Sequence, residues 1–112
     1  MTSPRMLKLL DELDENLALA TSLVGRGRER YRADIAVPLA FEALCNRIGE
    51  LAKRLMNEDA KRFTSIEWRL AAQNRDFVVH QYWQVDSEIL WDTVAVSFVR
   101  LGAQADVVRA TL

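Results

Sequence analysis

The only histidine of the chain, His80, lies in the segment 75–86, RDFVVHQYWQVD, among charged and aromatic residues. Asp76 stands four residues earlier, so on a helix the two side chains share one face. The Asp76 carboxylate would then hold one ring nitrogen, fix the tautomer and leave the other nitrogen free to act as a base. The alternative is that His80 is a core residue whose ring is satisfied by the fold. Spacing alone does not separate these two interpretations.

Arg75 is the second candidate, and it stands five residues before His80. Five residues correspond to about 140° around an α-helix, so the two side chains do not meet on one straight helix. We therefore expect one of two arrangements. Either the helix is distorted near His80, or a second copy of the chain completes the site, because a two-fold axis brings the same surface together twice.

An arginine and a histidine beside a phosphodiester would make a ribonuclease. The histidine removes the proton of the ribose 2′-hydroxyl, and the arginine binds the phosphate and stabilises the charge that develops on it. Because the nucleophile belongs to the substrate, cleavage is restricted to RNA and needs no metal ion. The chain has one histidine, one cysteine and no acidic set at a metal-binding spacing, so we expect neither a metal site nor a cofactor.

The composition is that of a small helical protein with nearly balanced charge. The 112 residues indicate a single domain, 1–112, and only four glycines and two prolines interrupt the sequence. A net charge of −1 excludes a protein that coats nucleic acid by general phosphate neutralisation, so any RNA contact has to be local. A single cysteine, Cys45, and the lack of a membrane-length apolar run or a signal-peptide pattern lead us to expect a cytoplasmic protein without membrane contact.

Two helices are predicted in the first half of the chain. The first begins at Pro4 behind a serine cap and ends at Gly25. The second covers 34–57, with Pro38 near its start and Gly49 in its interior, where a glycine often lets another helix come close. The apolar stripe assigned to this second helix consists of Ile35, Leu39, Phe41, Leu44, Cys45, Ile48, Leu51, Ala52 and Leu55.

Two more helices follow. A capping box over 64–67, with Thr64 as the cap, predicts a helix over 65–81. Asp86 predicts the start of a last long helix whose apolar residues recur in steps of three and four. Short connections imply antiparallel neighbours, so the expected fold is an all-α, four-helix, antiparallel up-and-down bundle, with room for an extra short helix.

An arginine-rich stretch, GRGRERYR, connects the first two helices. One interpretation is a solvated connection whose positive charge complements the C-terminal end of the preceding helix. The other is a patch that contacts RNA or a protein partner. Its members are Arg26, Arg28, Arg30 and Arg32.

Three segments carry a family resemblance: NRIGELAKRL (46–55), WRLAAQNRDFVVHQYWQVD (68–86) and ILWDTV (89–94). Together they resemble the HepT family, the small all-helical toxins of the HEPN superfamily that are paired with MntA-like minimal nucleotidyltransferase antitoxins. The resemblance covers about residues 30–110. Its most specific part is the Arg-x4-His-x-Tyr motif formed by Arg75, His80 and Tyr82, preceded by Trp68.

The resemblance implies a HEPN-like bundle acting as a metal-independent endoribonuclease and working as a homodimer. Arg75 and His80 would form the catalytic pair, with Asp76 assisting. Tyr82 would match the tyrosine to which the antitoxin adds AMP groups. Phosphate charge two residues from His80 would then block RNA binding by repulsion and occlusion.

One departure from the family pattern keeps alternatives open. The family most often has asparagine after the key arginine, whereas Asp76 places a negative charge beside the expected phosphate site. The first hypothesis is the toxin ribonuclease under antitoxin control. The second is a catalytically inert helical subunit of a nucleotidyltransferase complex. The third is a structural bundle in which His80 and Tyr82 are satisfied packing groups.

Overall fold

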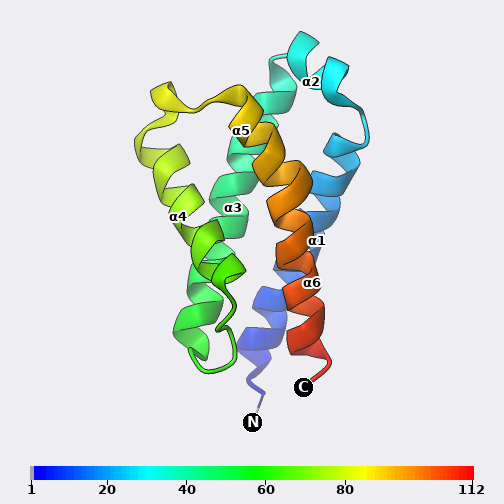
Figure 1. The fold of residues 1–112 in the computed structure, drawn as a ribbon. Coiled ribbons are helices and arrows are strands. Elements are labelled where there is room, and N and C mark those ends of the chain that lie inside the picture. Colours follow the sequence, from blue (N-terminus) through cyan, green and yellow to red (C-terminus); the bar gives the residue numbers. More distant parts are fainter. Residues whose placement is uncertain (1) are drawn as a thin grey trace.

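The computed structural model describes residues 2–112, and its regular elements are all helical. In chain order they are α1 (Pro4–Val24), α2 (Arg28–Ala33), α3 (Ala36–Glu58), α4 (Ile66–His80), the 3₁₀ turn η1 (Tyr82–Gln84), α5 (Ser87–Asp92), the π-helical segment η2 (Thr93–Ser97) and α6 (Phe98–Arg109). Four long helical stretches lie side by side with alternating direction (Figure 1). The predicted antiparallel bundle is confirmed, and α2 is the extra short helix.

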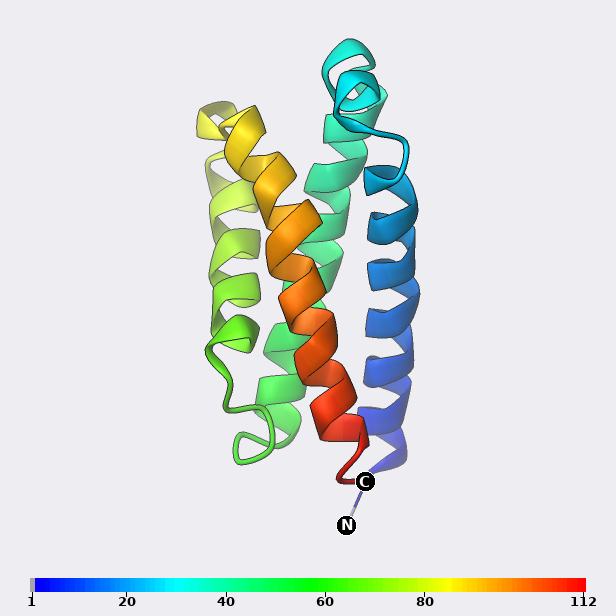
Figure 2. The same cartoon turned by 45° about the vertical axis from the view of Figure 1, so that its right-hand side comes forward.

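The last stretch, α5–η2–α6, crosses the bundle obliquely between α4 and α1 (Figure 2). Both termini lie at one end of the bundle, and α2 and the α4–α5 connection lie at the other (Figure 1). The end of α4 that carries His80 is therefore remote from the termini. No helix within the described residues is long and apolar enough to cross a membrane.

The predicted start of α1 is confirmed in detail. The Ser3 side chain accepts a hydrogen bond from the Met6 backbone N–H at 3.0 Å, and Pro4 occupies the first turn, where no amide hydrogen is needed. The predicted cap of the third long helix is wrong by one residue. Ser65 caps α4 by accepting from the Glu67 backbone N–H, while Thr64 lies outside the helix.

The core is a set of stripes, one from each long helix. The predicted stripe of the last helix is buried throughout, at Leu90, Val94, Phe98, Leu101, Ala105 and Val108. On α3 the prediction is wrong at Ile35 and Leu39, which are 74% and 57% exposed. The helix begins at Ala36 and buries Val37 and Phe41, so positions 35 and 39 face away from the core.

The arginine-rich connection is more ordered than a solvated loop. It forms α2, whose Tyr31 is buried, with its ring centroid 4.9 Å from that of Phe41 and 5.1 Å from that of Trp91. The Tyr31 hydroxyl donates a hydrogen bond to the Ser87 carbonyl at 2.6 Å. Burial, and next the charge of Glu88, raise the pKa of Tyr31 to about 12. The short helix is thus attached to the start of α5.

The predicted last helix is continuous but not uniform. It begins at the predicted cap, since the Asp86 carboxylate accepts from the backbone N–H groups of Glu88 and Ile89. The π-helical segment η2 interrupts it at Thr93, whose hydroxyl donates to the Ile89 carbonyl at 2.9 Å. Such side-chain bonds to the preceding turn are known to bend helices.

Candidate active site at the crossing of α3 and α4

Arg75 lies on the face of α4 that is otherwise buried in the core. The buried residues of α4 are Trp68, Ala71 and Val78. Arg75 fits between the last two, so the steps along the stripe are three, four and three residues. The start of its side chain is therefore directed at α3, although the residue is an arginine.

Gly49 makes this placement possible. A Cβ atom built on Gly49 would lie 2.1 Å from Arg75 Cβ, 2.6 Å from the Ala71 carbonyl oxygen and 2.9 Å from Arg75 Cγ. Since no other residue type leaves that space free, α3 and α4 can approach this closely only at a glycine. The expectation that Gly49 admits another helix is confirmed.

Three acceptors surround the Arg75 guanidinium. Its Nε donates to Asn46 Oδ1 at 3.0 Å and lies 3.8 Å from Glu50 Oε2, and its Nη1 donates to Asp76 Oδ1 at 3.1 Å. Glu50 also accepts from Arg54 Nε at 3.3 Å. The Arg75 side chain remains 24% exposed, so its orientation is fixed while an anion can still reach it.

The guanidinium faces an open groove between α1 and α3. Glu12, Glu15 and Asn16 line it from α1, and Asn46, Arg47, Glu50, Leu51 and Arg54 line it from α3, together with Arg75. The α1 wall therefore carries acidic side chains, whereas the other wall carries arginines together with Glu50. A phosphate entering this groove would meet a fixed guanidinium.

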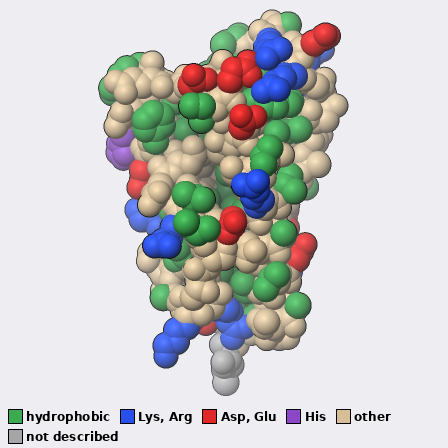
Figure 3. Space-filling view, viewed as in Figure 1, with side chains coloured by type: hydrophobic (Ala, Val, Ile, Leu, Met, Phe, Trp, Pro, Cys, Tyr) green, Lys and Arg blue, Asp and Glu red, His purple; other side chains and the backbone are tan. Residues whose placement is uncertain are grey.

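His80 is the last residue of α4 and is exposed, so the interpretation as a core histidine is wrong. It is the purple side chain at the edge of the molecule in Figure 3. The helix remains regular to this point, since the Gln81 backbone N–H donates to the Phe77 carbonyl at 2.8 Å. The distortion that would turn His80 toward Arg75 is therefore not found.

The structure pairs Asp76 with Arg75 rather than with His80. Within residues 2–112 neither a hydrogen bond nor an ion pair joins Asp76 to His80, while Asp76 Oδ1 accepts from Arg75 Nη1. One protomer thus brings Arg75 and Asp76 together and leaves the imidazole of His80 in solvent. Within that same part of the chain no group of three or more histidine, cysteine, aspartate or glutamate side chains is placed to hold a metal ion.

Tyr82 and Trp83 follow His80 in the turn η1 and are 65% and 66% exposed. Their ring centroids lie 5.4 Å apart in an edge-to-face arrangement. The two rings thus contact each other and leave the Tyr82 hydroxyl accessible. Tyr82 is therefore not a packing group of the bundle.

The four arginines between α1 and α3 divide into two kinds. Arg28 and Arg32 both bind Glu88, at 2.9 Å and 3.0 Å, and Arg30 lies 3.4 Å from Asp34. The pKa of the Glu88 carboxyl is lowered, and the hydrogen bond from Arg32 is the largest cause. Arg26 is exposed and makes no ion pair with the described residues. Structural pairing therefore accounts for three of the four.

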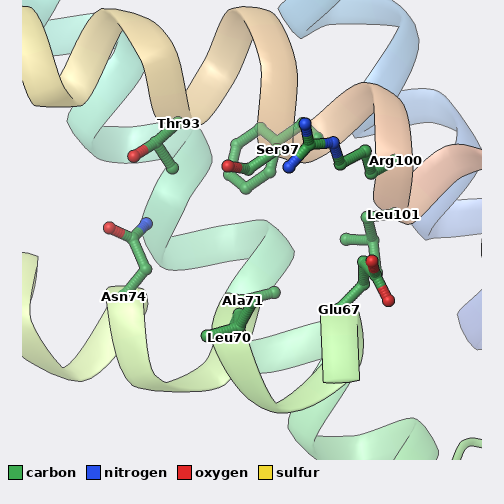
Figure 4. A pocket seen from close by; sticks show the side chains of 9 residues that line it. Glu67, Leu70, Ala71, Asn74, Thr93, Ser97, Arg100 and Leu101 are labelled. Atoms are coloured by element: carbon green, nitrogen blue, oxygen red, sulfur yellow. The ribbon is translucent and has the colours of Figure 1, made fainter. Parts of the chain in front are cut away.

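A second hollow lies between α4 and the segment η2–α6. Figure 4 shows Asn74 and Thr93 facing each other across it, with Glu67 and Arg100 farther along. The Asn74 side-chain nitrogen is buried without a hydrogen-bond partner. None of the residues predicted to do chemistry lines this hollow, so the α1–α3 groove is the better candidate.

Asn46 and Glu50 contact Arg75 at the candidate site and were not predicted from the sequence. Both lie within the segment that carried the family resemblance, and with Gly49 they occupy positions i, i+3 and i+4 of α3. That spacing puts them on one helix face. A mid-helix glycine flanked in this way is the signal that could have identified them as the partners of Arg75.

Comparisons with known proteins point to a ribonuclease family. The family model described as "Ribonuclease HepT-like" matches residues 13–108. A protein of Caldanaerobacter subterraneus subsp. tengcongensis named "Putative RNase TTE0752" is 28% identical over 92 residues, covering 82% of each chain. A protein of Thermococcus cleftensis named "Probable ribonuclease HepT" is 40% identical over 47 residues, covering 42% of this chain and 43% of that protein. No solved structure gives a significant match.

We predict that Gly49→Ala destabilises the fold, because the new methyl group would overlap Arg75 Cβ and the Ala71 carbonyl. Overpacking of this kind typically costs about 1–3 kcal/mol. Urea unfolding followed by circular dichroism measures the change. Gly102→Ala is the matched control, since its methyl group would meet only Leu17 Cδ1 at 3.7 Å. That variant should keep or gain stability through its helix propensity. Equal stability of Gly49→Ala and the parent would show that α3 and α4 are not in close contact there.

Proposed function

We propose, from the premise that this chain belongs to the HepT-like ribonuclease family, that it is a toxin endoribonuclease whose active site uses Arg75 and His80. The observation that carries the proposal is how the Arg75 side chain is held and what it faces. Its guanidinium is held by three acceptors at the edge of an open groove, where an RNA phosphate can take the place of a carboxylate.

Arg75 would bind the scissile phosphate. Guanidinium groups donate paired hydrogen bonds that match phosphate geometry. Asn46 can keep its bond to Nε while a phosphate takes over the Nη1 donor that now faces Asp76. The positive charge then stabilises the extra negative charge of the transition state.

His80 would act on the attacking group. Its neutral imidazole takes the proton of the ribose 2′-hydroxyl, and the oxygen attacks the adjacent phosphorus. The bond from phosphorus to the 5′ oxygen breaks, giving a 2′,3′-cyclic phosphate and a 5′-hydroxyl whose proton comes from solvent. The protein supplies orientation and charge, and the nucleophile belongs to the RNA.

The two groups would meet across a two-fold axis. The regular end of α4 separates them by about 140° within one protomer, so Arg75 of one copy and His80 of another form the composite site. Exposed apolar side chains within three residues of His80 fit a surface that a second copy covers: Phe77, Val79 and Trp83. A two-fold contact uses the same patch on both chains and therefore builds two identical sites.

Tyr82 would be the control point. It is exposed and stands two residues after His80. An MntA-like nucleotidyltransferase would join the Tyr82 oxygen to the α-phosphorus of ATP, with release of pyrophosphate. The added phosphodiester charge would repel RNA and its bulk would cover the site. This partner would be the antitoxin.

One observation favours a second function, that of an inert subunit in a nucleotidyltransferase complex. Asp76 lies 3.1 Å from Arg75 Nη1, so the phosphate-binding charge is already balanced within the chain. The pair is partly exposed, and such ion pairs contribute little free energy. RNA can therefore displace Asp76 at small cost, which is why the ribonuclease remains the primary proposal.

We predict that His80→Ala abolishes RNA cleavage and toxicity while the dimer persists. Loss of a general base typically lowers a rate by about 10²–10⁴-fold. The measurement is growth after induction, together with cleavage of total RNA by the purified proteins. His80 is exposed, so the variant should melt at the parent temperature. Equal toxicity of parent and variant would contradict the catalytic role, and a non-toxic parent would support the inert subunit.

We predict that Tyr82→Phe still cleaves RNA but escapes control by an MntA-like nucleotidyltransferase. The chain has only two tyrosines, and the Tyr31 hydroxyl is bonded to the Ser87 carbonyl in the core. Incubation with the transferase and ATP should therefore add AMP to the parent, as mass spectrometry would show, and not to Tyr82→Phe. Silencing of Tyr82→Phe that still requires ATP would refute this role.

A further inference from the structure

Two arginines outside the proposed catalytic pair have no ion pair within the described residues and line grooves that lead to Arg75. They are Arg26, in the connection between α1 and α2, and Arg47, on the exposed side of α3. The neighbouring arginines Arg28, Arg30 and Arg32 are neutralised by acidic partners. Arg26 and Arg47 therefore place positive charge that is not ion-paired beside these grooves.

The two grooves are adjacent parts of one seam. The upper part lies between the second half of α1 and the first half of α3, with Leu19, Leu23, Ala40 and Leu44 among its lining residues. The lower part contains Arg75 and Arg54. Arg47 lines both parts, so the two grooves adjoin at this residue. From Ala40 to Arg54 it follows α3 for about 21 Å.

We propose that this seam, and not α2, carries single-stranded RNA to Arg75, with Arg26 and Arg47 binding phosphates on one side of the scissile bond. The inference rests on the proposed ribonuclease function and deepens it by assigning the substrate path. A groove that follows the backbone with spaced positive charges is how proteins bind single strands without reading sequence. The aliphatic lining of the upper part offers apolar surface to the faces of the bases.

The acidic wall of the seam agrees with this path. Glu12 and Glu15 face the groove from α1 and would repel phosphates, so the backbone runs against the arginines of α3. Carboxylates accept hydrogen bonds from base amino groups, so the bases can turn toward α1. A double helix presents phosphates on both sides and would meet repulsion from this wall.

The test measures binding of a short, fluorescein-labelled single-stranded RNA of mixed sequence to a protein carrying His80→Ala, which binds without cutting. The dissociation constant is measured over a range of salt concentrations. Each phosphate contact to a single strand contributes about 0.7 to the slope of log affinity against log salt. In that background, adding Arg26→Gln and Arg47→Gln should lower the slope by about 1.4. Arg47→Lys, which keeps the charge, should retain its contribution.

The matched control is Arg69→Gln in the same background. Arg69 is exposed on α4 and lines neither part of the seam, so its loss should leave the slope unchanged. An unchanged slope in the double variant, or an equal decrease in the Arg69 variant, would overturn the path. If the parent cleaves RNA in that case, the ribonuclease function stands without it. If the parent does not cleave but the slope depends on Arg26 and Arg47, the path stands and catalysis fails. Failure to bind RNA would overturn both.

Discussion

The close approach of α3 and α4 at Gly49 is the contact on which the site depends. A Cβ at position 49 would overlap the Arg75 side chain. Because glycine has no Cβ, the Arg75 side chain can extend out of the interface between the two helices. Arg75 therefore keeps a place on the inner stripe of α4 while its charged end reaches solvent between α3 and α1. Asn46 and Glu50, on the same face of α3, then fix the guanidinium. The close packing of α3 against α4 therefore also determines where the charge of Arg75 lies.

A second constraint is the pairing of arginines with acidic side chains at the α2 end of the bundle. Glu88 forms ion pairs with Arg28 and Arg32, and the Tyr31 hydroxyl donates a hydrogen bond to the Ser87 carbonyl. Through these contacts α2 holds the start of α5, which follows the connection that carries Tyr82. These arginines stabilise the end of the bundle rather than offering charge to a ligand. Arg75 is different, since it lines an open groove and its Nε is held by an uncharged acceptor, Asn46. This difference separates a structural arginine from one suited to bind phosphate.

The sequence predicted most of the fold, but not the neighbours that surround Arg75 in the candidate site. Periodicity and caps located α1 closely, and a glycine inside α3 indicated a close approach, because such signals are local. The prediction for Ile35 and Leu39 was wrong because the helix begins at Ala36 and buries Val37 and Phe41 instead. The bonds from Arg28 and Arg32 to Glu88 span 60 and 56 residues. They depend on how helices are placed in space, which local spacing does not give. The role of Asn46 was missed for the same reason.

The central claim is that Arg75 and His80 act across two copies of the chain, and mixing two inactive variants tests it most directly. Arg75→Ala and His80→Ala are purified separately, mixed in equal amounts, unfolded and refolded together, and assayed for RNA cleavage. Half of the dimers should then be mixed, each with one intact composite site, so about a quarter of the parent activity should return. A mixture that forms mixed dimers yet remains as inactive as its components would show that the two residues act within one chain or not together at all.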